Sequence, residues 1–303
     1  MQPILRLGTR GSPLALVQAR LVATALRDAH GWGPELIEIE PIATSGDQLR
    51  DRPLAAMGGK ALWTKELDSA LLEGRIDLAV HSMKDVETIR TPELVIAAML
   101  PRADSRDRLV GARSVDSLPE GARVGTSSPR RAAQMLARRP DLAILPFRGN
   151  VETRLRKIDL GEVDATLLAA AGLDRLGHSE IGSVLDDFLP APAQGAIGIE
   201  VRSGDRRIRT LVGAIDDRPT RLCVTAERRL LEGLGGSCRS PVAALAVLEG
   251  DSIHLRAEIL TEDGREAEAC DRRFASADDA VPVELAREML ARAPARLRAL
   301  FGL

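Results

Sequence analysis

Apolar and polar positions along the chain follow two periods, which together predict an ordered series of strands and helices. Residues 4–9 have the apolar run of a strand, and residues 11–31 then have apolar positions three and four apart, as in a helix. Ser12 is placed as the N-cap of this helix, Pro13 as its first residue and Gly31 just beyond its end. Because strand and helix signals keep alternating, we expect mostly parallel sheets.

The first part of the series contains one long stretch without any period. Residues 35–42 alternate like a strand, residues 64–74 are helical, and residues 76–82 form another strand. Between the first two of these, residues 44–61 have three glycines and no apolar period, so they are predicted to form a long mobile loop.

The same order starts again near residue 104. Residues 122–139 read as strand, Gly-Thr turn, Ser-Pro and helix, which repeats residues 6–20 with one residue fewer in the turn. Two units built alike predict two similar α/β domains with a cleft between them. Residues 100–107 and 189–195 are the expected crossings, and the apolar strand after the second crossing is expected to complete the first sheet.

The last part of the chain differs in character. Residues 220–234 form one helix, three strands with hairpin connections follow, and residues 278–300 close the chain as a helix. The predicted fold class is therefore α/β, with two similar α/β domains arranged as in periplasmic binding proteins and a small α+β C-terminal domain. The expected domains are residues 1–99 with 197–214, residues 104–192, and residues 217–303.

Composition excludes several classes of protein. Hydrophobic residues make up 45% and charged residues 28% of the 303 positions, which is typical of a soluble globular protein. No apolar run reaches the ~20 residues of a membrane span, and the N-terminus lacks a secretory pattern, so we expect a cytoplasmic protein. The net charge of −2 and the absence of tyrosine argue against nucleic acid as a partner. Three cysteines and four histidines, all scattered, predict neither a metal site nor a disulfide framework.

Polar side chains gather where the predicted strands end, which is where ligands bind in open α/β sheets. Both Ser-Pro turns also place a helix N-terminus there, with free N–H groups. Such a donor-rich, cationic site favours a polyanion, with carboxylate and phosphate equally possible, although each basic residue alone could be a solvated surface charge. The side chains concerned are Thr9, Arg10, Ser12, His81, Ser82, Lys84, Asp85, Thr126, Ser127, Ser128, Arg130, Arg131, Arg148, Asn150, Arg154 and Arg175.

Three residues allow two interpretations each. Asp85 is either a salt-bridge partner of a nearby cation or a carboxylate that moves protons and stabilises a cation formed during reaction. His81 could be a base, but packing on a buried strand is the favoured interpretation. Cys238 follows two glycines and precedes Arg239, so it is either a small buried residue or a reactive or modified thiol whose pKa the cations lower.

Several stretches together resemble the porphobilinogen deaminase family, also called the hydroxymethylbilane synthase family. They include "TRGSPLALVQ", "HSMKDV", "VGTSSPRR", "FRGNVETRL", "QGAIGIE" and "GGSCRSPVA", in order from the first strand into the last domain. The resemblance implies a transferase of haem and tetrapyrrole biosynthesis that joins four porphobilinogen molecules head to tail, with loss of ammonia, into hydroxymethylbilane. It also implies a dipyrromethane cofactor bound through a thioether to Cys238, a monomer, no metal, and no nucleic-acid or membrane partner.

The resemblance assigns roles residue by residue. Asp85 matches the catalytic carboxylate, and Lys60 and Trp63 match a mobile flap with an aromatic residue. The cofactor-binding matches are Cys238, Ser82, Lys84, Asp85, Thr126, Ser127, Ser128, Arg130, Arg131, Arg148 and Gly149. The substrate-binding matches are Arg10, Ser12, Arg148, Arg154, Arg175 and Gln194.

The chain departs from the common family pattern in a few loop positions. Trp63 stands where phenylalanine is usual, Pro129 where leucine is usual, and Ala193 and Ser237 where glycine is common, while a proline common after Val86 is missing. None of these changes removes a matched functional group. Two rival functions use the same pattern: a solute receptor with two α/β lobes, which leaves Asp85 and Cys238 unused, and an enzyme with a cysteine nucleophile, which lacks a local histidine.

Overall fold

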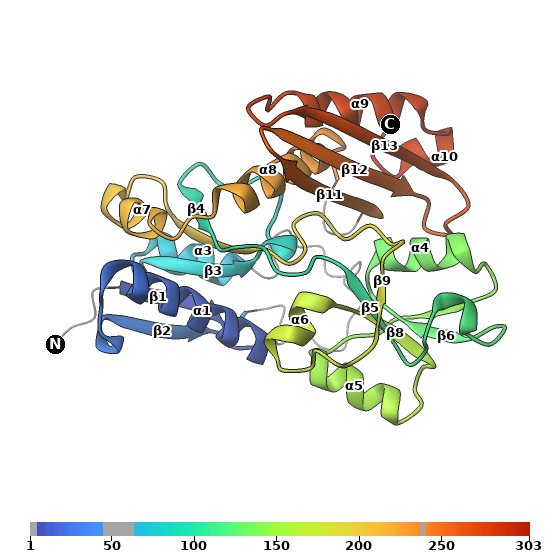
Figure 1. Ribbon diagram of the computed structural model, residues 1–303, viewed down its shortest axis with the longest axis horizontal. Coiled ribbons are helices and arrows are strands. Elements are labelled where there is room, and N and C mark those ends of the chain that lie inside the picture. The colour runs from blue at the N-terminus through green and yellow to red at the C-terminus, as the bar shows by residue number, and fades with distance from the viewer. Residues whose placement is uncertain (1–4, 45–63, 237–239) are drawn as a thin grey trace. The chain divides into compact units, whose positions relative to one another are not determined.

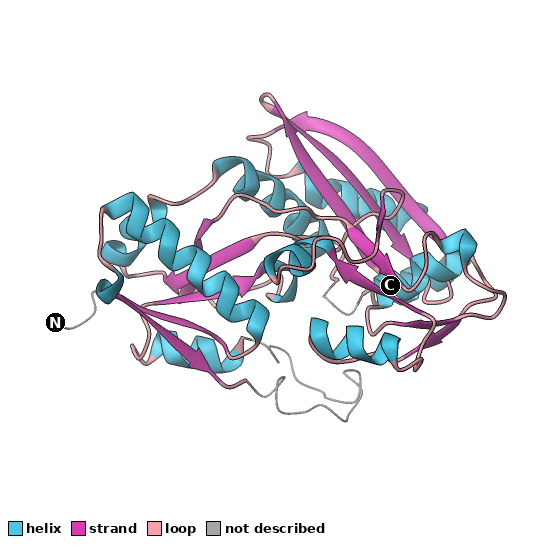
Figure 2. Cartoon of the chain, turned by 60° about the horizontal axis from the view of Figure 1, so that its bottom comes forward, coloured by secondary structure: helices cyan, strands magenta, loops and turns pink. Residues whose placement is uncertain are grey.

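The computed structural model describes residues 5–44, 64–236 and 240–303 (Figure 1). The chain divides into two compact units, Met1–Ala103 with Ala196–Arg221, and Asp104–Gly195 with Leu222–Leu303. The strands of the described residues form two sheets of five strands and one sheet of three. The chain contains both helices and strands, and these sheets confirm the predicted α/β fold class (Figure 2). The predicted domain boundaries and the cleft stay predictions.

The sheet of the first unit has the order β2-β1-β3-β10-β4. Strand β10 pairs with β3 and β4, so the chain does return to this sheet after the second crossing. The strands are β1 (Leu5–Arg10), β2 (Ile37–Ile42), β3 (Leu78–Ser82), β4 (Leu94–Met99) and β10 (Ile197–Arg202).

Helix α1 (Pro13–His30) packs its apolar side on this sheet, where Val22 and Leu26 join the buried strand residues. The helix begins and ends as predicted: the Ser12 hydroxyl accepts a hydrogen bond from the N–H of Ala15, and Gly31 takes a left-handed conformation with φ of 66°. The other helical segments of the unit are η1 (Pro34–Leu36), α3 (Lys65–Leu72), η3 (Met83–Asp85) and α7 (Arg206–Gly213).

The second unit repeats this plan with the strand order β7-β6-β8-β5-β9. Helix α4 (Pro129–Arg138) starts at the second Ser-Pro turn, with Pro129 as its first residue and Ser128 as its N-cap. The strands are β5 (Asp107–Val110), β6 (Arg123–Gly125), β7 (Ala143–Leu145), β8 (Ala165–Ala169) and β9 (Ser183–Leu185). The remaining helices are η4 (Val115–Ser117), α5 (Val151–Asp159) and α6 (Ala170–Arg175).

A three-stranded antiparallel sheet completes the second unit (Figure 1). Its strands β11 (Val242–Glu249), β12 (Ser252–Leu260) and β13 (Ala267–Ala275) share one core with α8 (Arg218–Gly233) and α9 (Val281–Arg292). The prediction of one closing helix is wrong, because the chain ends α9 and starts a separate α10 (Ala295–Ala299). Pro294 explains the break, since it disfavours helical geometry at Ala293, whose ψ is 141°.

The prediction of mostly parallel sheets is confirmed, because each five-stranded sheet has four strands in one direction and one reversed strand. In the first sheet β1 runs parallel to β2 and β3, whereas β10 runs antiparallel to both of its neighbours. In the second sheet β6 runs parallel to β7 and β8, whereas β5 runs antiparallel to β8 and β9. A crossover helix sets the direction of the parallel pairs, but β10 and β5 follow the two crossings of the chain and enter in the opposite direction.

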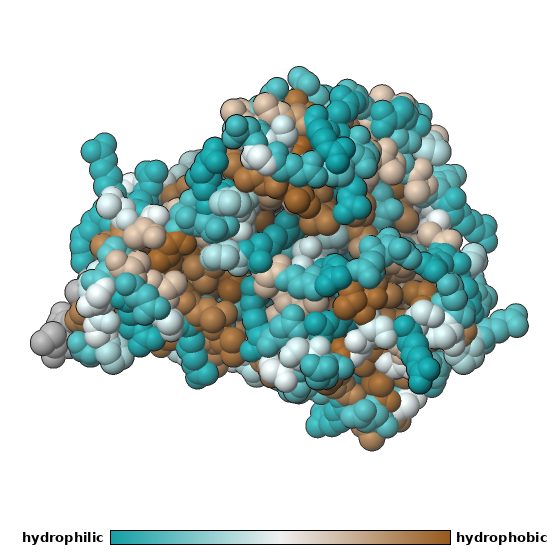
Figure 3. All heavy atoms as spheres, viewed as in Figure 1, coloured by the Kyte–Doolittle hydropathy of each residue, from teal (hydrophilic) through white to brown (hydrophobic). Residues whose placement is uncertain are grey.

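The outer surface mixes polar and apolar residues. On the face drawn in Figure 3, hydrophilic residues are interspersed with small hydrophobic patches. None of the helices in the described part of the chain has both the length and the apolar character needed to cross a membrane.

Ala193 is the one residue other than glycine with a positive φ in the described chain, at 64°. This conformation costs an L-residue about 1–2 kcal/mol, whereas losing the buried methyl group costs about 0.8 kcal/mol. We therefore expect Ala193→Gly to stabilise the protein by roughly 0.5 kcal/mol and to raise its melting temperature slightly in a thermal scan. A lower melting temperature would show that methyl packing dominates.

Candidate active site

Asp85 lies at the end of η3, a short turn directly after β3. Met83 in this turn is fully buried, and its N–H donates a 3.1 Å hydrogen bond to the carbonyl of Ala196. Gly198 on β10 is required here, because a Cβ atom at that position would come within 2.1 Å of the Met83 sulfur. The turn is thereby fixed to the middle of the sheet and holds Asp85 at a defined position.

A pocket in the first unit opens beside this turn. Its polar lining residues are Arg10, Ser12, Gln18, Thr64, His81, Ser82 and Asp85. The Ser82 hydroxyl is held by Gln18, whose Nε2 and Oε1 lie 2.8 and 3.0 Å away. The carboxylate of Asp85 makes no hydrogen bond or ion pair within the described part of the chain, so the alternative salt bridge is not formed there. An unpaired carboxylate beside a pocket is available to a ligand.

His81 is buried on β3, as the favoured interpretation expects. Its Nε2 atom lies 3.1 Å from a carboxylate oxygen of Glu200, and the two side chains are 4% and 0% exposed. No local pattern connects these two residues, because Glu200 reaches β3 only after the chain has returned to the first sheet.

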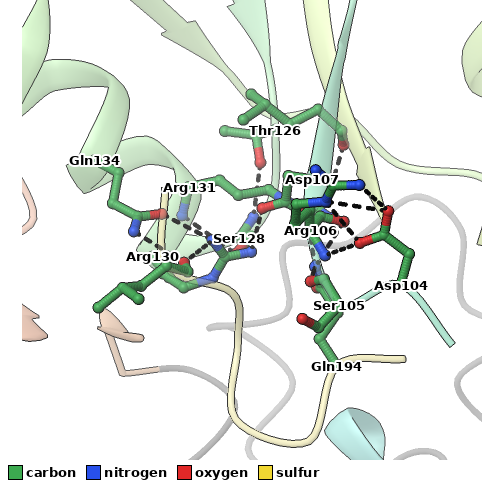
Figure 4. Close-up of polar contacts among 12 residues, drawn as sticks. Asp104, Ser105, Arg106, Asp107, Thr126, Ser128, Arg130, Arg131, Gln134 and Gln194 are labelled. Atoms are coloured by element: carbon green, nitrogen blue, oxygen red, sulfur yellow. Dashed lines mark hydrogen bonds and ion pairs between the residues drawn. The ribbon is translucent and has the colours of Figure 1, made fainter. Parts of the chain in front are cut away.

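The second unit holds two of the predicted arginines around a buried carboxylate (Figure 4). Asp107, at the start of β5, accepts a hydrogen bond of 2.8 Å from Arg130 and one of 2.7 Å from Arg131. The amide of Gln194 donates a third hydrogen bond of 2.8 Å to the same carboxylate. Arg130 and Arg131 are 3% and 6% exposed, so they are not the solvated surface charges of the alternative interpretation.

Two guanidinium groups share one carboxylate in this cluster, and the negative charge of Glu258 also acts on Arg130. Burial alone would raise the pKa of Asp107, but the charges and hydrogen bonds of Arg130 and Arg131 hold it well below its usual range. One carboxylate therefore faces two guanidinium groups, and the buried Nε atoms of both arginines have no hydrogen-bond partner. Sequence reasoning missed Asp107, although an aspartate opening a buried apolar strand is a signal that could have identified it.

The hydroxyl groups beside the cluster partly serve local structure. Ser128 caps α4, and the hydroxyl of Thr126 accepts a hydrogen bond from the N–H of Ser128. The Ser127 hydroxyl donates to the carbonyl of Phe147 and accepts from its N–H, at 3.0 and 3.1 Å. These bonds fix the turn between β6 and α4, on which the two arginines depend.

The other predicted arginines of the second unit differ in the hydrogen bonds that their guanidinium nitrogens make. Arg148 has a buried Nη2 atom that lacks any hydrogen-bond partner. Arg154 donates from Nε to the carbonyl of Gly149, and Arg175 donates from Nη2 to that of Gly195, at 3.0 and 2.7 Å. Arg148 is therefore the clearest candidate in this unit for binding an anion from outside the chain.

Three predicted residues, Lys60, Trp63 and Cys238, lie outside the described residues. The other two cysteines lie in a helix and a strand and lack the features of a reactive thiol. Cys223 is buried in the C-terminal core, and burial raises the pKa of the Cys270 thiol. No group of three potential metal ligands occurs in the described residues.

We expect Arg130→Leu to lower the stability of the protein and Arg148→Leu to weaken ligand binding. Leucine at position 130 removes one of the partners of buried Asp107, which should cost about 3 kcal/mol of unfolding free energy. Leucine at position 148 removes no hydrogen bond of Nη2 and should leave stability nearly unchanged while weakening ligand binding. Thermal unfolding and substrate saturation curves of both variants test this. Equal losses of stability would contradict it.

Two family models cover most of the chain. Residues 5–210 match the model described as "Porphobilinogen deaminase, dipyromethane cofactor binding domain", and residues 221–291 match "Porphobilinogen deaminase, C-terminal domain". The chain belongs to the porphobilinogen deaminase family. It is thus an enzyme of tetrapyrrole synthesis, from a family that polymerises porphobilinogen with a dipyrromethane cofactor.

Curated relatives agree with this assignment. The porphobilinogen deaminase of Sphingopyxis alaskensis is 53% identical over 98% of this chain and 96% of its own length. That of Paracoccus denitrificans is 51% identical over 96% of this chain and 95% of its own length.

Among solved structures, the methionine-binding protein MetQ is 13% identical, with a TM-score of 0.45 over 72% of this chain and 91% of that protein. A methionine-binding lipoprotein of Bacillus subtilis, described as putative in its structure's own name, is 14% identical with a TM-score of 0.43 over 71% of this chain and 91% of its own. Similarity at this level carries no argument about ligands.

Proposed function

We propose that this chain joins four porphobilinogen molecules head to tail, with release of ammonia, into linear hydroxymethylbilane, with Asp85 as the catalytic carboxylate. The observation that carries the proposal is the Asp85 carboxylate, which makes no hydrogen bond or ion pair within residues 5–44, 64–236 and 240–303 and lies beside a pocket whose lining includes Arg10, Ser12 and Ser82. Cations and hydroxyl groups suit the acetate and propionate of each pyrrole. A single free carboxylate suits the positive charge that develops when ammonia leaves.

The residues of the second unit fit a bound dipyrromethane. Its acetate and propionate groups need donors. Among the described residues of this unit, four buried guanidinium nitrogens lack a partner: Nη2 of Arg148 and the Nε atoms of Arg108, Arg130 and Arg131. Asp107 and Gln194 would hold the arginine pair in place, and Cys238 would form the thioether. When bound, dipyrromethane supplies the free pyrrole position to which the first substrate unit is joined.

Asp85 would act on the substrate in two ways. Its negative charge stabilises the cation left on porphobilinogen when the carbon–nitrogen bond to ammonia breaks. Its carboxylate oxygen then accepts the proton that leaves the pyrrole carbon as the new carbon–carbon bond forms. Arg10 and Ser12 would hold substrate carboxylates while this occurs, so that binding and proton transfer use separate groups.

The test of this function is the fate of porphobilinogen. The purified protein should consume it and release one ammonia for each molecule consumed, with a linear tetrapyrrole found by mass spectrometry. A solute receptor would instead bind porphobilinogen and return it unchanged on unfolding. Binding without ammonia release would therefore replace this proposal with the receptor.

The oligomeric state, the cellular location and the partner of the protein are also proposals. We expect a monomer in the cytoplasm whose partner is porphobilinogen, without nucleic acid or membrane. Light scattering of the cofactor-loaded protein in solution measures the oligomeric state, and fractionation of the cells that produce it measures the location.

A further inference from the structure

A buried carboxylate of the first unit joins the two chain segments that flank Asp85. Glu200 lies on β10 and is fully buried. Arg90 donates to both of its oxygens, from Nε at 2.8 Å and from Nη2 at 2.9 Å. Nε2 of His81 lies 3.1 Å from one of these oxygens. Burial alone would raise the pKa of Glu200, but His81 and Arg90 lower it to about 2, so the carboxylate is charged at neutral pH.

The two partners of Glu200 lie on either side of Asp85 in the chain. His81 precedes Asp85 by four residues on β3, and Arg90 follows it by five in the segment leading to β4. Glu200 thus holds both ends of the short segment that carries Asp85. A bidentate guanidinium contact also fixes orientation, which a single point charge does not.

Arg90 extends the same network to α3. Its Nη2 atom lies 2.5 Å from Asp68, and its Nη1 atom lies 3.4 Å from the hydroxyl of Thr64, which lines the pocket beside Asp85. Glu87 lies 3.5 Å from Arg90. The segment after Asp85 is therefore restrained by ionic contacts of Arg90 with Glu87, Asp68 and Glu200.

We propose that Glu200 is a positioning residue for Asp85, acting through His81 and Arg90. The proposal rests on the catalytic role of Asp85 proposed above. A displacement of about 1 Å at a reacting group can cost about 100-fold in rate, so the loss of either contact would slow the chemical step while substrate binding through the cations continues.

The test is a double-mutant cycle between Glu200→Gln and Asp85→Glu, measured as single-turnover elongation on cofactor-loaded protein whose loading is checked by intact mass. Glu200→Gln should slow the wild-type protein about 100-fold with little change in KM. With Asp85→Glu, whose carboxylate is already displaced, the same change should cost about 3-fold or less. Equal factors in both backgrounds, or a normal rate for Glu200→Gln, would overturn the proposal.

Two further variants serve as a replacement for Glu200→Gln and as a control for lost stability. Arg90→Lys retains the charge but loses the bidentate contact, so it replaces Glu200→Gln in the cycle if the latter does not fold, with the same expected coupling. Arg202→Met, on the same strand, removes a 3.0 Å ion pair with Asp205 and should lower the melting temperature without slowing elongation. An inactive wild-type protein would reject the proposed function, whereas an active one with additive effects would reject only the role of Glu200.

Discussion

Asp85→Asn is expected to fold, to keep its cofactor, and to lose turnover by about 1,000-fold or more. Asparagine has nearly the same shape, so the turn held by Met83 and Gly198 should form as before. It carries no negative charge, however, and its amide accepts a proton poorly. The variant therefore loses both the stabilisation of the substrate cation and the acceptor for the departing proton.

The pattern of the loss matters as much as its size. Affinity for porphobilinogen should fall much less than the rate, because the charge of Asp85 is needed mainly in the transition state. Asp85→Glu should retain a small fraction of the activity, since the charge survives but is displaced by one methylene group. Single-turnover kinetics on cofactor-loaded variants measure this directly. A normal elongation rate in Asp85→Asn would move the catalytic role to another residue, with His81 the next to test.

Cys238→Ala is expected to abolish cofactor attachment and, with it, all polymerisation. The purified wild-type protein should be heavier than its sequence by two linked pyrrole units, and the variant should match its sequence mass. The reason is chemical: alanine has no sulfur atom to form the thioether, and no other described cysteine is placed to replace it. Cys223 lies in a hydrophobic core, and burial raises the pKa of Cys270, which keeps it as an unreactive thiol.

Matched controls make this measurement specific. Cys223→Ala and Cys270→Ala should retain the excess mass and the activity, because Cys223 is buried in the C-terminal core and burial raises the pKa of the Cys270 thiol. A wild-type protein of unmodified mass and full activity would contradict the attachment. Loss of the excess mass in either control variant would show that the cofactor is attached to that cysteine and not to Cys238.

Local features of the chain were predictable because they depend on neighbouring residues. Ser12 and Ser128 cap their helices as expected, since an N-cap hydroxyl reaches only the N–H groups of the next turn. The position of Asp85 beside a pocket was predictable for a different reason, because alternation of strands and helices brings strand ends to one edge of a sheet. The family motifs at these positions then identified the chemistry.

The sequence by itself determined the order of the elements, the caps of the helices and the candidate site residues. Only the tertiary structure decided how those residues are held: Asp107 between Arg130 and Arg131, and Glu200 with Arg90 from 110 positions away. It also decided the mixed direction of both sheets. Helix and strand signals act over a few residues, whereas the partner of a buried charge depends on which strands become neighbours when the chain returns to a sheet.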